Sequence, residues 1–355
     1  MRPIVDRLVA KNYGCLKDVD VRLTPLHCFI GPNDSGKSTL LRAVKVLSSY
    51  MERGSSAKEL QAADVSDNDD GLYLCAESER HFYSISSTPP KGPDEKYGHV
   101  VSDSRGPRVH NVVGRGGIQP RALHPIDGQF CDFLATARLI RLDPQTLATS
   151  SSLIPDNQPL DFYSEHGAGL AGIYDALMNR DVEGFLEVVA RVRKLFPTVS
   201  KIQLRNTSTT SKRLEIELND GRRVSVDRIS TGLLYFLAYS AIPYLDPCSI
   251  LLIEEPENGL HPARIAEVMS ILREVSKNTQ VLIATHSPLV VNELQPEEVS
   301  IVTREPEAGT KVTPLVDTPN FEARSKVYAL GELWVSYANG DDEGPLLNPP
   351  SSEQE

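Results

Sequence analysis

The sequence has few of the features that mark secreted, metal-binding or membrane-spanning chains. Its 355 residues include only five cysteines, scattered along the chain, and no two of them stand at metal-ligand spacing. A reduced, cytoplasmic chain is the simplest account of this pattern. No apolar run approaches the ~20 residues of a membrane span, and the first residues lack the apolar core of a signal peptide. We therefore expect no membrane partner.

Positive charge is scarce too. The 37 Lys and Arg residues face 48 Asp and Glu residues, which gives a net charge of −11. This balance does not favour tight, non-specific binding of nucleic acid, although it is compatible with a local basic groove. The sequence has no internal repeat at solenoid spacing and no heptad run long enough for a coiled-coil arm. With 40% hydrophobic and 24% charged residues, we expect a globular chain of one large or two ordinary domains.

What the sequence does contain is a phosphate-binding pattern, because residues 31–39 (GPNDSGKST) fit G-x-x-x-x-G-K-[ST]. An apolar run of strand type, 26–30, precedes the loop, and apolar residues at helical spacing, 40–47, follow it. Gly31 and Gly36 let backbone N–H groups turn toward an anion, and the helix N-terminus adds its partial positive charge. The alternative, a glycine-rich turn that happens to contain a lysine, does not account for these flanks.

The residue types in the loop predict how it holds a magnesium nucleotide. We expect Lys37 to reach the β- and γ-phosphates, Ser38 to place its hydroxyl on Mg²⁺, and Thr39 to support the α-phosphate.

Two later strands are predicted to bring acidic and imidazole groups to the same ligand. The apolar run 249–253 ends at Glu254 and Glu255, and carboxylates at the carboxyl end of a core strand lie where open α/β sheets hold ligands. One carboxylate can hold Mg²⁺ through water, and the other can polarise the attacking water. His286 follows the next predicted strand, 280–284. We favour a γ-phosphate contact for it over a purely structural role.

Two polar positions are more ambiguous. Ser230, Thr231 and Gly232 precede an apolar helix, so Ser230 is either an ordinary N-cap or a phosphate contact at a helix N-terminus. Its position just upstream of the Glu254 strand favours the second interpretation. Gln145 follows the strand-like run 133–142 and can sense Mg²⁺ and the attacking water, the alternative being an ordinary loop residue.

The region after the predicted P-loop helix contains three short β-like runs. We expect them to form an antiparallel meander that widens the nucleotide-binding sheet. The runs are Leu72–Ala76, His81–Ser86 and His99–Ser102. Residues 104–128 are rich in Gly, Pro and Arg, and we prefer a mobile surface loop to a nucleic-acid contact because no aromatic residue is interleaved for base stacking. The arginines concerned are Arg105, Arg108, Arg115 and Arg121.

A helical lobe is predicted next. Two helices are expected within residues 167–196, the second of them, 182–196, ending before Pro197. Strand-like runs at 202–204, 214–218 and 224–226 follow, with a hairpin turn at Asn219-Asp220-Gly221. An amphipathic helix is expected at 262–277, and the acidic, Pro- and Ser-rich residues 340–355 are expected to be disordered.

This order of motifs resembles the ABC-type ATPases, and within them the RecF/SMC-like branch that includes the ATPase half of OLD-family nucleases. The phrases typical of that branch are GPNDSGKSTLL, ILLIEEPENGLHP and IATHSP, and the resemblance covers residues 1 to about 305. It implies an α/β P-loop NTPase fold, an ABC-type ATPase head with a mixed central sheet, an antiparallel β subdomain and a helical lobe. The implied segments are 1–54 with the Walker A loop, 55–145 as the β subdomain, 146–229 as the helical lobe and hairpin, 230–305 with the remaining motifs, and 306–355 as a C-terminal extension.

The resemblance also implies roles and cofactors, namely ATP and Mg²⁺. Glu254 takes the Walker B position, Glu255 that of the catalytic base, and His286 that of the switch histidine. Lys37 joins Glu255 and His286 as a catalytic residue, and Ser38, Glu254 and Gln145 are the expected metal contacts. Residues 258–261 fall at the D-loop. The expected nucleotide contacts are Gly31, Asn33, Ser35, Gly36, Lys37, Ser38 and Thr39, with Ser230 and Gly232 of the signature motif.

Such ATPases pair head to tail, so the resemblance implies a homodimer or higher homo-oligomer with ATP sandwiched between copies. The chain shows no nuclease carboxylate cluster, and Val302–Glu355 is too short for a nuclease domain. We therefore expect an ATPase subunit that controls a separate effector, such as a nuclease or toxin in bacterial phage defence or DNA repair. Glu254 stands where Asp is usual, so hydrolysis is expected to be slow.

Two alternatives stay open. One is an ATP-gated scaffold or DNA-binding module with little turnover. The other is a transporter nucleotide-binding subunit, against which the 217-residue separation of Lys37 and Glu254 (254 − 37) and the shortened signature both argue.

Overall fold

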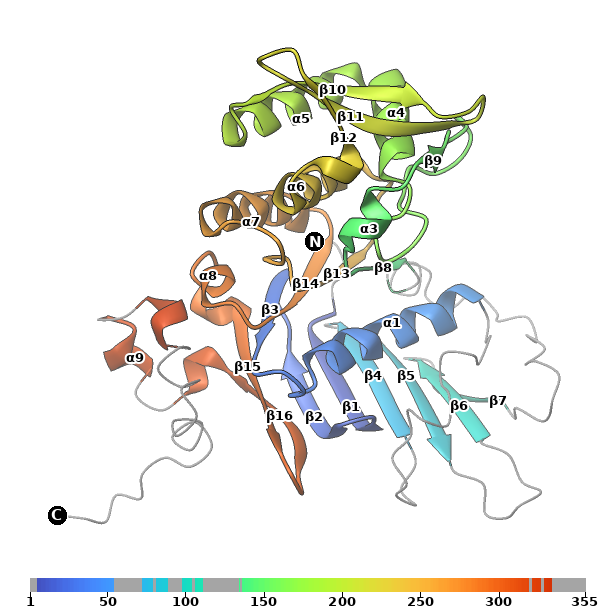
Figure 1. The fold of residues 1–355 in the computed structure, drawn as a ribbon. Coiled ribbons are helices and arrows are strands. Elements are labelled where there is room, and N and C mark those ends of the chain that lie inside the picture. The colour runs from blue at the N-terminus through green and yellow to red at the C-terminus, as the bar shows by residue number, and fades with distance from the viewer. Residues whose placement is uncertain are drawn as a thin grey trace. The chain divides into compact units, whose positions relative to one another are not determined.

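The computed structural model describes residues 5–53, 72–78, 81–88, 98–103, 106–110, 134, 136–318, 321–326 and 329–333 (Figure 1). The chain divides into two compact units. The first unit comprises Met1–Arg138, Cys248–Ile253 and Asn278–Glu355, and the second comprises Leu139–Pro247 and Glu254–Lys277. Within the described ranges, no helix combines the length and the apolar character that a membrane crossing requires.

A mixed six-stranded sheet carries the P-loop strand. Its strand order is β16-β15-β3-β14-β13-β8, with β3 parallel to both of its neighbours and β15 antiparallel to β16. Every residue of β3, β13 and β14 is buried, which is why these strands are continuous apolar runs without a polar alternation. The strands are β3 (Leu26–Ile30), β8 (Ala137–Ile140), β13 (Ile250–Glu254), β14 (Gln280–Thr285), β15 (Val299–Glu305) and β16 (Gly309–Pro314). The mixed α/β fold predicted from the sequence is confirmed.

The antiparallel meander is present, but its predicted place was wrong. It continues from β1 in a second six-stranded sheet of order β2-β1-β4-β5-β6-β7, and so does not widen the P-loop sheet. The reason is that β3 already has β14 and β15 on its two edges, whereas β1 pairs with β2 on one side and accepts β4 on the other. The strands are β1 (Arg7–Tyr13), β2 (Leu16–Arg22), β4 (Leu72–Ser78), β5 (His81–Thr88), β6 (Gly98–Asp103) and β7 (Gly106–His110).

Helix α1 (Lys37–Arg53) contacts strands of both sheets, namely β14 in one and β1, β4 and β5 in the other (Figure 1). Two apolar neighbours require a wide apolar face, and the buried side chains of α1 supply it. The fully buried ones are Leu40, Leu41, Ala43, Val44 and Leu47.

The second unit contains the two helices predicted within residues 167–196. Helix α4 spans Leu170–Arg180 and α5 spans Val182–Leu195. The carboxylate of Asp181 accepts a hydrogen bond from the Gly184 N–H at 2.9 Å and so caps α5, which ends before Pro197 as predicted. Helix α6 (Thr231–Ala241) contacts α3 (Pro144–Leu147), α4, α5 and α7 (Pro262–Ser276), and its residues from Gly232 onward are buried.

The strands of the second unit form a small antiparallel sheet beside these helices. Strand β11 (Ser211–Leu218) is its centre, flanked by β10 (Val199–Asn206), β12 (Arg223–Ser225) and the short β9 (Ser151–Ser152). The predicted hairpin turn before β12 is confirmed, and Gly221 there has φ +80°. The remaining short elements are α3 (Pro144–Leu147), α8 (Pro288–Val291), α9 (Phe321–Arg324) and 3₁₀ turns at Val226–Arg228, Ile242–Tyr244, Pro296–Glu298 and Leu315–Asp317.

The structure describes part of the predicted surface loop and part of the predicted C-terminal extension. The part of 104–128 that the structure describes is strand β7, which contains Arg108, and the other three arginines of that stretch lie outside the described residues. Strand β16 lies in the segment assigned to the C-terminal extension, yet it pairs with β15 in the P-loop sheet. The expected disorder of 340–355 also concerns residues outside the described ranges.

A buried histidine makes the stability of the first unit pH-dependent. His27 of β3 is 2% exposed, with Nε2 3.1 Å from the Ser300 hydroxyl and Nδ1 3.2 Å from the Thr24 hydroxyl. Burial lowers its pKa from 6.5 to about 4. The folded protein therefore keeps the neutral ring while the unfolded chain takes up a proton, so this stability is present above pH 6.5 and is lost as pH falls toward 4.

We expect the free energy of unfolding to fall by about 2 kcal/mol between pH 7.5 and pH 5 through this residue alone. Urea denaturation at both pH values would measure it, with His27→Gln as the control because glutamine cannot titrate in this range. An equal pH dependence in wild type and His27→Gln would contradict the assignment.

Candidate nucleotide-binding site

The P-loop and His286 follow neighbouring parallel strands at the same end of the central sheet. Ile30, the last residue of β3, is in register with Thr285 of β14 and with Ile301 of β15, and both pairings are parallel. The residues that follow, Gly31 and His286, therefore start from adjacent strand ends within the first unit. His286 is exposed there, and the turn behind it is fixed because the Ser287 N–H donates to the Thr285 hydroxyl at 2.9 Å.

Two glycines of the loop are required by close approach. A Cβ on Gly31 would overlap the carbonyl oxygen of Val302 and would lie 2.8 Å from the Ser35 hydroxyl. Gly36 has φ +109°, and a Cβ there would meet the Thr310 side chain and lie 2.9 Å from the Cys15 sulfur. Between them Asp34 also adopts the left-handed region, at φ +63°. The loop therefore turns tightly against β15 and β16.

Side chains from those two strands fasten the loop from behind. The Thr310 hydroxyl donates to the Ser35 carbonyl at 2.8 Å, and the Arg304 guanidinium donates to the Asp34 carbonyl at 3.3 Å. Sequence reasoning missed both residues because they lie about 270 positions beyond the loop. The only available signal was the β-branched run within 299–303, which favours a strand but does not identify its neighbour.

The loop's interior suits a phosphate group. Lys37 is 6% exposed, and its ammonium donates to the carbonyls of Gly31 at 2.8 Å and Pro32 at 2.7 Å. Ser35 is 1% exposed, and among the described residues its hydroxyl has no hydrogen-bond partner. A buried cation, an unsatisfied hydroxyl and a cradle that a Cβ would fill together fit an anionic ligand.

The remaining loop residues lie where the motif predicts. Ser38 and Thr39 are half-buried in the first turn of α1, and the Thr39 hydroxyl accepts a weak hydrogen bond from the Cys15 thiol at 3.5 Å. Asn33 is exposed at the tip of the loop. The nucleotide and metal contacts assigned to these residues stay predictions.

The second unit holds the acidic residues. Glu254 ends β13 with its side chain only 5% exposed, and the Arg141 guanidinium lies 3.6 Å from its carboxylate. A buried carboxylate needs such compensation. Sequence reasoning missed Arg141, although its place between β8 and Asp143-Pro144 was a signal. Glu255 follows at φ +49°, an unfavourable conformation for a side chain of this kind and one that is common at functional sites.

The signature turn, Ser230-Thr231-Gly232, lies against the turn that follows Glu255. Ser230 caps α6 by accepting from the Leu233 N–H at 3.3 Å, while Ser230 and Thr231 stay exposed. A Cβ on Gly232 would lie 2.9 Å from the Gly259 carbonyl oxygen, and Gly259 (φ +68°) lies against Tyr235 and Thr231. These contacts place Gly259 against the first turn of α6.

Gln145 is exposed on α3, also in the second unit. The carboxylate of Asp143 caps that helix by accepting from the Thr146 N–H at 2.7 Å, and hydrogen bonds from Thr146 lower the pKa of Asp143. The Tyr235 hydroxyl donates to the Leu142 carbonyl at 3.2 Å and ties α6 to this segment. The structure thus groups the P-loop with His286 in one unit, and Glu254, Glu255, Gln145 and Ser230 in the other. Their convergence on one nucleotide stays a prediction.

A family model described as "AAA domain, putative AbiEii toxin, Type IV TA system" matches residues 26–292, from the P-loop strand to the turn after His286. The chain belongs to this family. The match includes the P-loop, the Glu254 strand and the His286 strand. This membership agrees with the P-loop ATPase class that the sequence motifs predict.

The chain is also similar to proteins of two other kinds. A 44-residue segment of this AAA-family chain is 46% identical to the OLD nuclease of Thermus scotoductus, and this segment covers 12% of the chain and 8% of that nuclease. A crystal structure of an SMC head bound to the C-winged helix domain of ScpA matches 88% of the chain and 97% of its own length, with a TM-score of 0.53 and 14% identity. An SMC head with an extended coiled coil, bound to a domain of ScpA derived from Pyrococcus furiosus, matches 91% of the chain with a TM-score of 0.49 and 13% identity.

Proposed function

We propose that this protein binds and hydrolyses ATP, dimerises head to tail around it, and thereby controls a separate effector. The effector would be a nuclease or toxin in bacterial phage defence or DNA repair. The observation that carries the ATPase half is the P-loop interior, where the buried Lys37 ammonium and the unsatisfied Ser35 hydroxyl fit phosphate. The family match supports the same activity.

The exposed end of α6 supports head-to-tail pairing. Nearly all of this helix is buried, yet Ser230 and Thr231 at its N-terminus are open to solvent. A helix N-terminus favours negative charge, and here its hydroxyl groups add donors. We infer that this turn contacts the γ-phosphate of ATP bound in the P-loop of a second copy.

The proposed chemistry distributes three tasks among the chain's own residues. Lys37 binds and orients the phosphates, Glu255 accepts a proton from the attacking water, and His286 contacts the γ-phosphate. Ser38 and Glu254, with Gln145, would hold Mg²⁺, which when bound neutralises charge on the β- and γ-phosphate oxygens. Each role is a prediction from the motif and from local geometry.

Slow turnover is favoured by the surroundings of Glu254. Its carboxylate is almost buried and already faces Arg141 at 3.6 Å, so a metal must compete with a guanidinium for it. This arrangement keeps a second candidate function in view, an ATP-gated scaffold whose assembly matters more than its turnover.

Glu255→Gln tests the proposal. Glutamine keeps the size of the side chain but cannot accept the proton, so we expect hydrolysis to fall by about 10²–10⁴-fold. ATP should then hold the variant as a dimer, which light scattering with and without ATP would detect.

Two matched variants separate the causes. Adding Lys37→Ala to Glu255→Gln should abolish the ATP-dependent dimer through loss of ATP binding. Adding Ser230→Arg should abolish the dimer while ATP binding persists, because the arginine blocks the signature turn only. A Glu255→Gln protein that binds ATP and stays monomeric would overturn head-to-tail pairing.

A further inference from the structure

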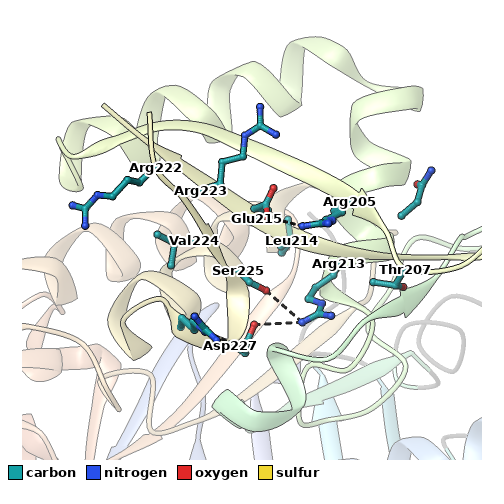
Figure 2. Close-up of a pocket in the computed structure, with 12 residues that line it drawn as sticks. Arg205, Thr207, Arg213, Leu214, Glu215, Arg222, Arg223, Val224, Ser225 and Asp227 are labelled. Atoms are coloured by element: carbon teal, nitrogen blue, oxygen red, sulfur yellow. Dashed lines mark hydrogen bonds and ion pairs between the residues drawn. The ribbon is translucent and has the colours of Figure 1, made fainter. Parts of the chain in front are cut away.

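A second cluster of functional groups lies far along the sequence from the P-loop, on the small sheet of the second unit. A pocket of about 810 Å³ opens over β10, β11 and β12 (Figure 2). Five arginines but only two carboxylates line it, an excess of three positive charges in a chain of net charge −11. We call this surface the arginine pocket. Its charged lining residues are Arg205, Arg213, Arg222, Arg223, Arg228, Glu215 and Asp227.

The strand register assembles the pocket. Arg205 of β10 is directly opposite Arg213 of β11, so both guanidinium groups rise from the same face of the sheet. Along β11 the buried residues Leu214 and Ile216 alternate with the residues that point outward. Figure 2 shows Arg205 turned toward Glu215 and Arg213 turned toward Ser225 and Asp227, while Arg223 extends away from them.

Two of the four carboxylates that pair with these arginines lie below them. Glu215 and Glu217 are 12% and 14% exposed, whereas their partners Arg205 and Arg223 are 75% and 61% exposed. A hydrogen bond from Lys201 lowers the pKa of Glu217, so it stays ionised. Glu215 and Glu217 therefore hold the guanidinium groups of Arg205 and Arg223 in place, whereas Asp220 and Asp227 are about half exposed beside the other three arginines. Five arginines against these four carboxylates leave the surface with a positive excess.

We propose that the arginine pocket binds the phosphate backbone of double-stranded nucleic acid. Guanidinium groups pair with phosphate through two parallel hydrogen bonds, and all five cations that line the pocket are arginines. Four of the five guanidinium groups belong to side chains that are more than 60% exposed, and Arg213 is 42% exposed. Each contact is therefore weak, and a ligand must present several phosphates at once. A duplex does so with one charge per ~1.7 Å of its axis.

The lining also argues for a duplex over a single strand. No aromatic side chain is among the described residues that line the pocket, so it has no platform on which unpaired bases could stack. An acidic protein segment would bring a lower density of charge than a duplex, and it enters the test as a competing outcome. The proposal does not depend on ATP hydrolysis, because the P-loop belongs to the other unit.

The test uses the two most exposed arginines. Arg222 and Arg228 are 76% and 82% exposed, and they pair with the exposed carboxylates Asp220 and Asp227, so changing them leaves the buried acids Glu215 and Glu217 compensated. The variant Arg222→Glu/Arg228→Glu should fold normally. Lys194→Glu/Lys277→Glu is the matched control, since both lysines are exposed, belong to the same unit, lie outside the pocket, and change net charge equally.

Binding of a fluorescent 20-base-pair DNA would be followed by anisotropy from 50 to 300 mM salt, without ATP. We expect the pocket variant to bind at least about 10-fold more weakly near 0.1 M salt, and its log–log salt slope to fall by about 2. The control should match wild type. Arg222→Lys/Arg228→Lys should keep the slope, because it keeps the charge.

Three outcomes would overturn the proposal. They are no duplex binding by wild type at 50 mM salt, an equal loss in the lysine control, or preferential binding of a poly-glutamate peptide over the duplex. Repeating the assay with Lys37→Ala separates the two proposals, since loss of ATP binding should leave duplex affinity unchanged.

Discussion

Replacing Lys37 with alanine is expected to lower ATP turnover by about 10²–10³-fold and to weaken ATP binding strongly. The ammonium is almost buried and is held against the carbonyls of Gly31 and Pro32. A preorganised cation in a site that excludes water stabilises developing phosphate charge far more than one in solvent, and removing one such donor typically costs this much. Phosphate release and ATP titration by calorimetry would measure the two effects.

Lys45, two turns along the same helix, provides the matched control. Its ammonium donates to the Ala137 carbonyl at 2.7 Å, so Lys45→Ala also removes a lysine–carbonyl hydrogen bond of α1. It should change thermal stability by a similar amount but leave ATP binding intact. If both variants lost ATP binding equally, the effect of Lys37 would be structural, and its assignment as a phosphate ligand would fail.

Gly31→Ala is expected to weaken ATP binding at least about 10-fold and to destabilise the first unit by about 1–3 kcal/mol. The added Cβ would overlap the Val302 carbonyl oxygen, which is backbone of the neighbouring strand β15 and cannot rotate away. The start of the loop must therefore shift, and its N–H groups lose their alignment toward the anion. Urea denaturation and ATP titration would report the two consequences.

Gly221→Ala is the control for this variant, because an alanine at that position meets no neighbouring atom. Gly221 has φ +80° and nothing within 4 Å of a built Cβ, so alanine there adds backbone strain of about 1–2 kcal/mol without a clash. Gly221→Ala should leave ATP binding unchanged. Normal ATP affinity in Gly31→Ala would show that the loop accommodates the methyl group, contrary to the geometry.

The helices and strands that bear the motifs could be predicted because their signals are local. Each of these elements is indicated by a pattern within about ten residues. Examples are the strand ending at Ile30, the helix beginning at Lys37 and the apolar run ending at Glu254. The N-cap that the sequence offered as one reading of Ser230 is present, because the capping oxygen and the N–H that it accepts from lie three residues apart.

Sheet membership could not be predicted in this way. The meander strands look the same whether they extend the β3 sheet or the β1 sheet, and the choice depended on which edge was already paired. The arginine pocket was hidden for a related reason. Arg205 and Arg213 stand eight residues apart and come together only through the antiparallel register of β10 and β11. The arginines of 104–128, by contrast, can be recognised as a group from the sequence because they lie close together along the chain.

The sequence by itself determined that this chain is a P-loop ATPase, since the residues that cradle a phosphate are contiguous and their chemistry follows from their types and order. The tertiary structure alone decided what supports that loop and where else charge accumulates. Thr310, Arg304 and Val302 approach the P-loop from about 270 residues away, and five arginines meet over one small sheet. Such contacts depend on strand order and register, which are set by packing of the whole chain and not by any one stretch.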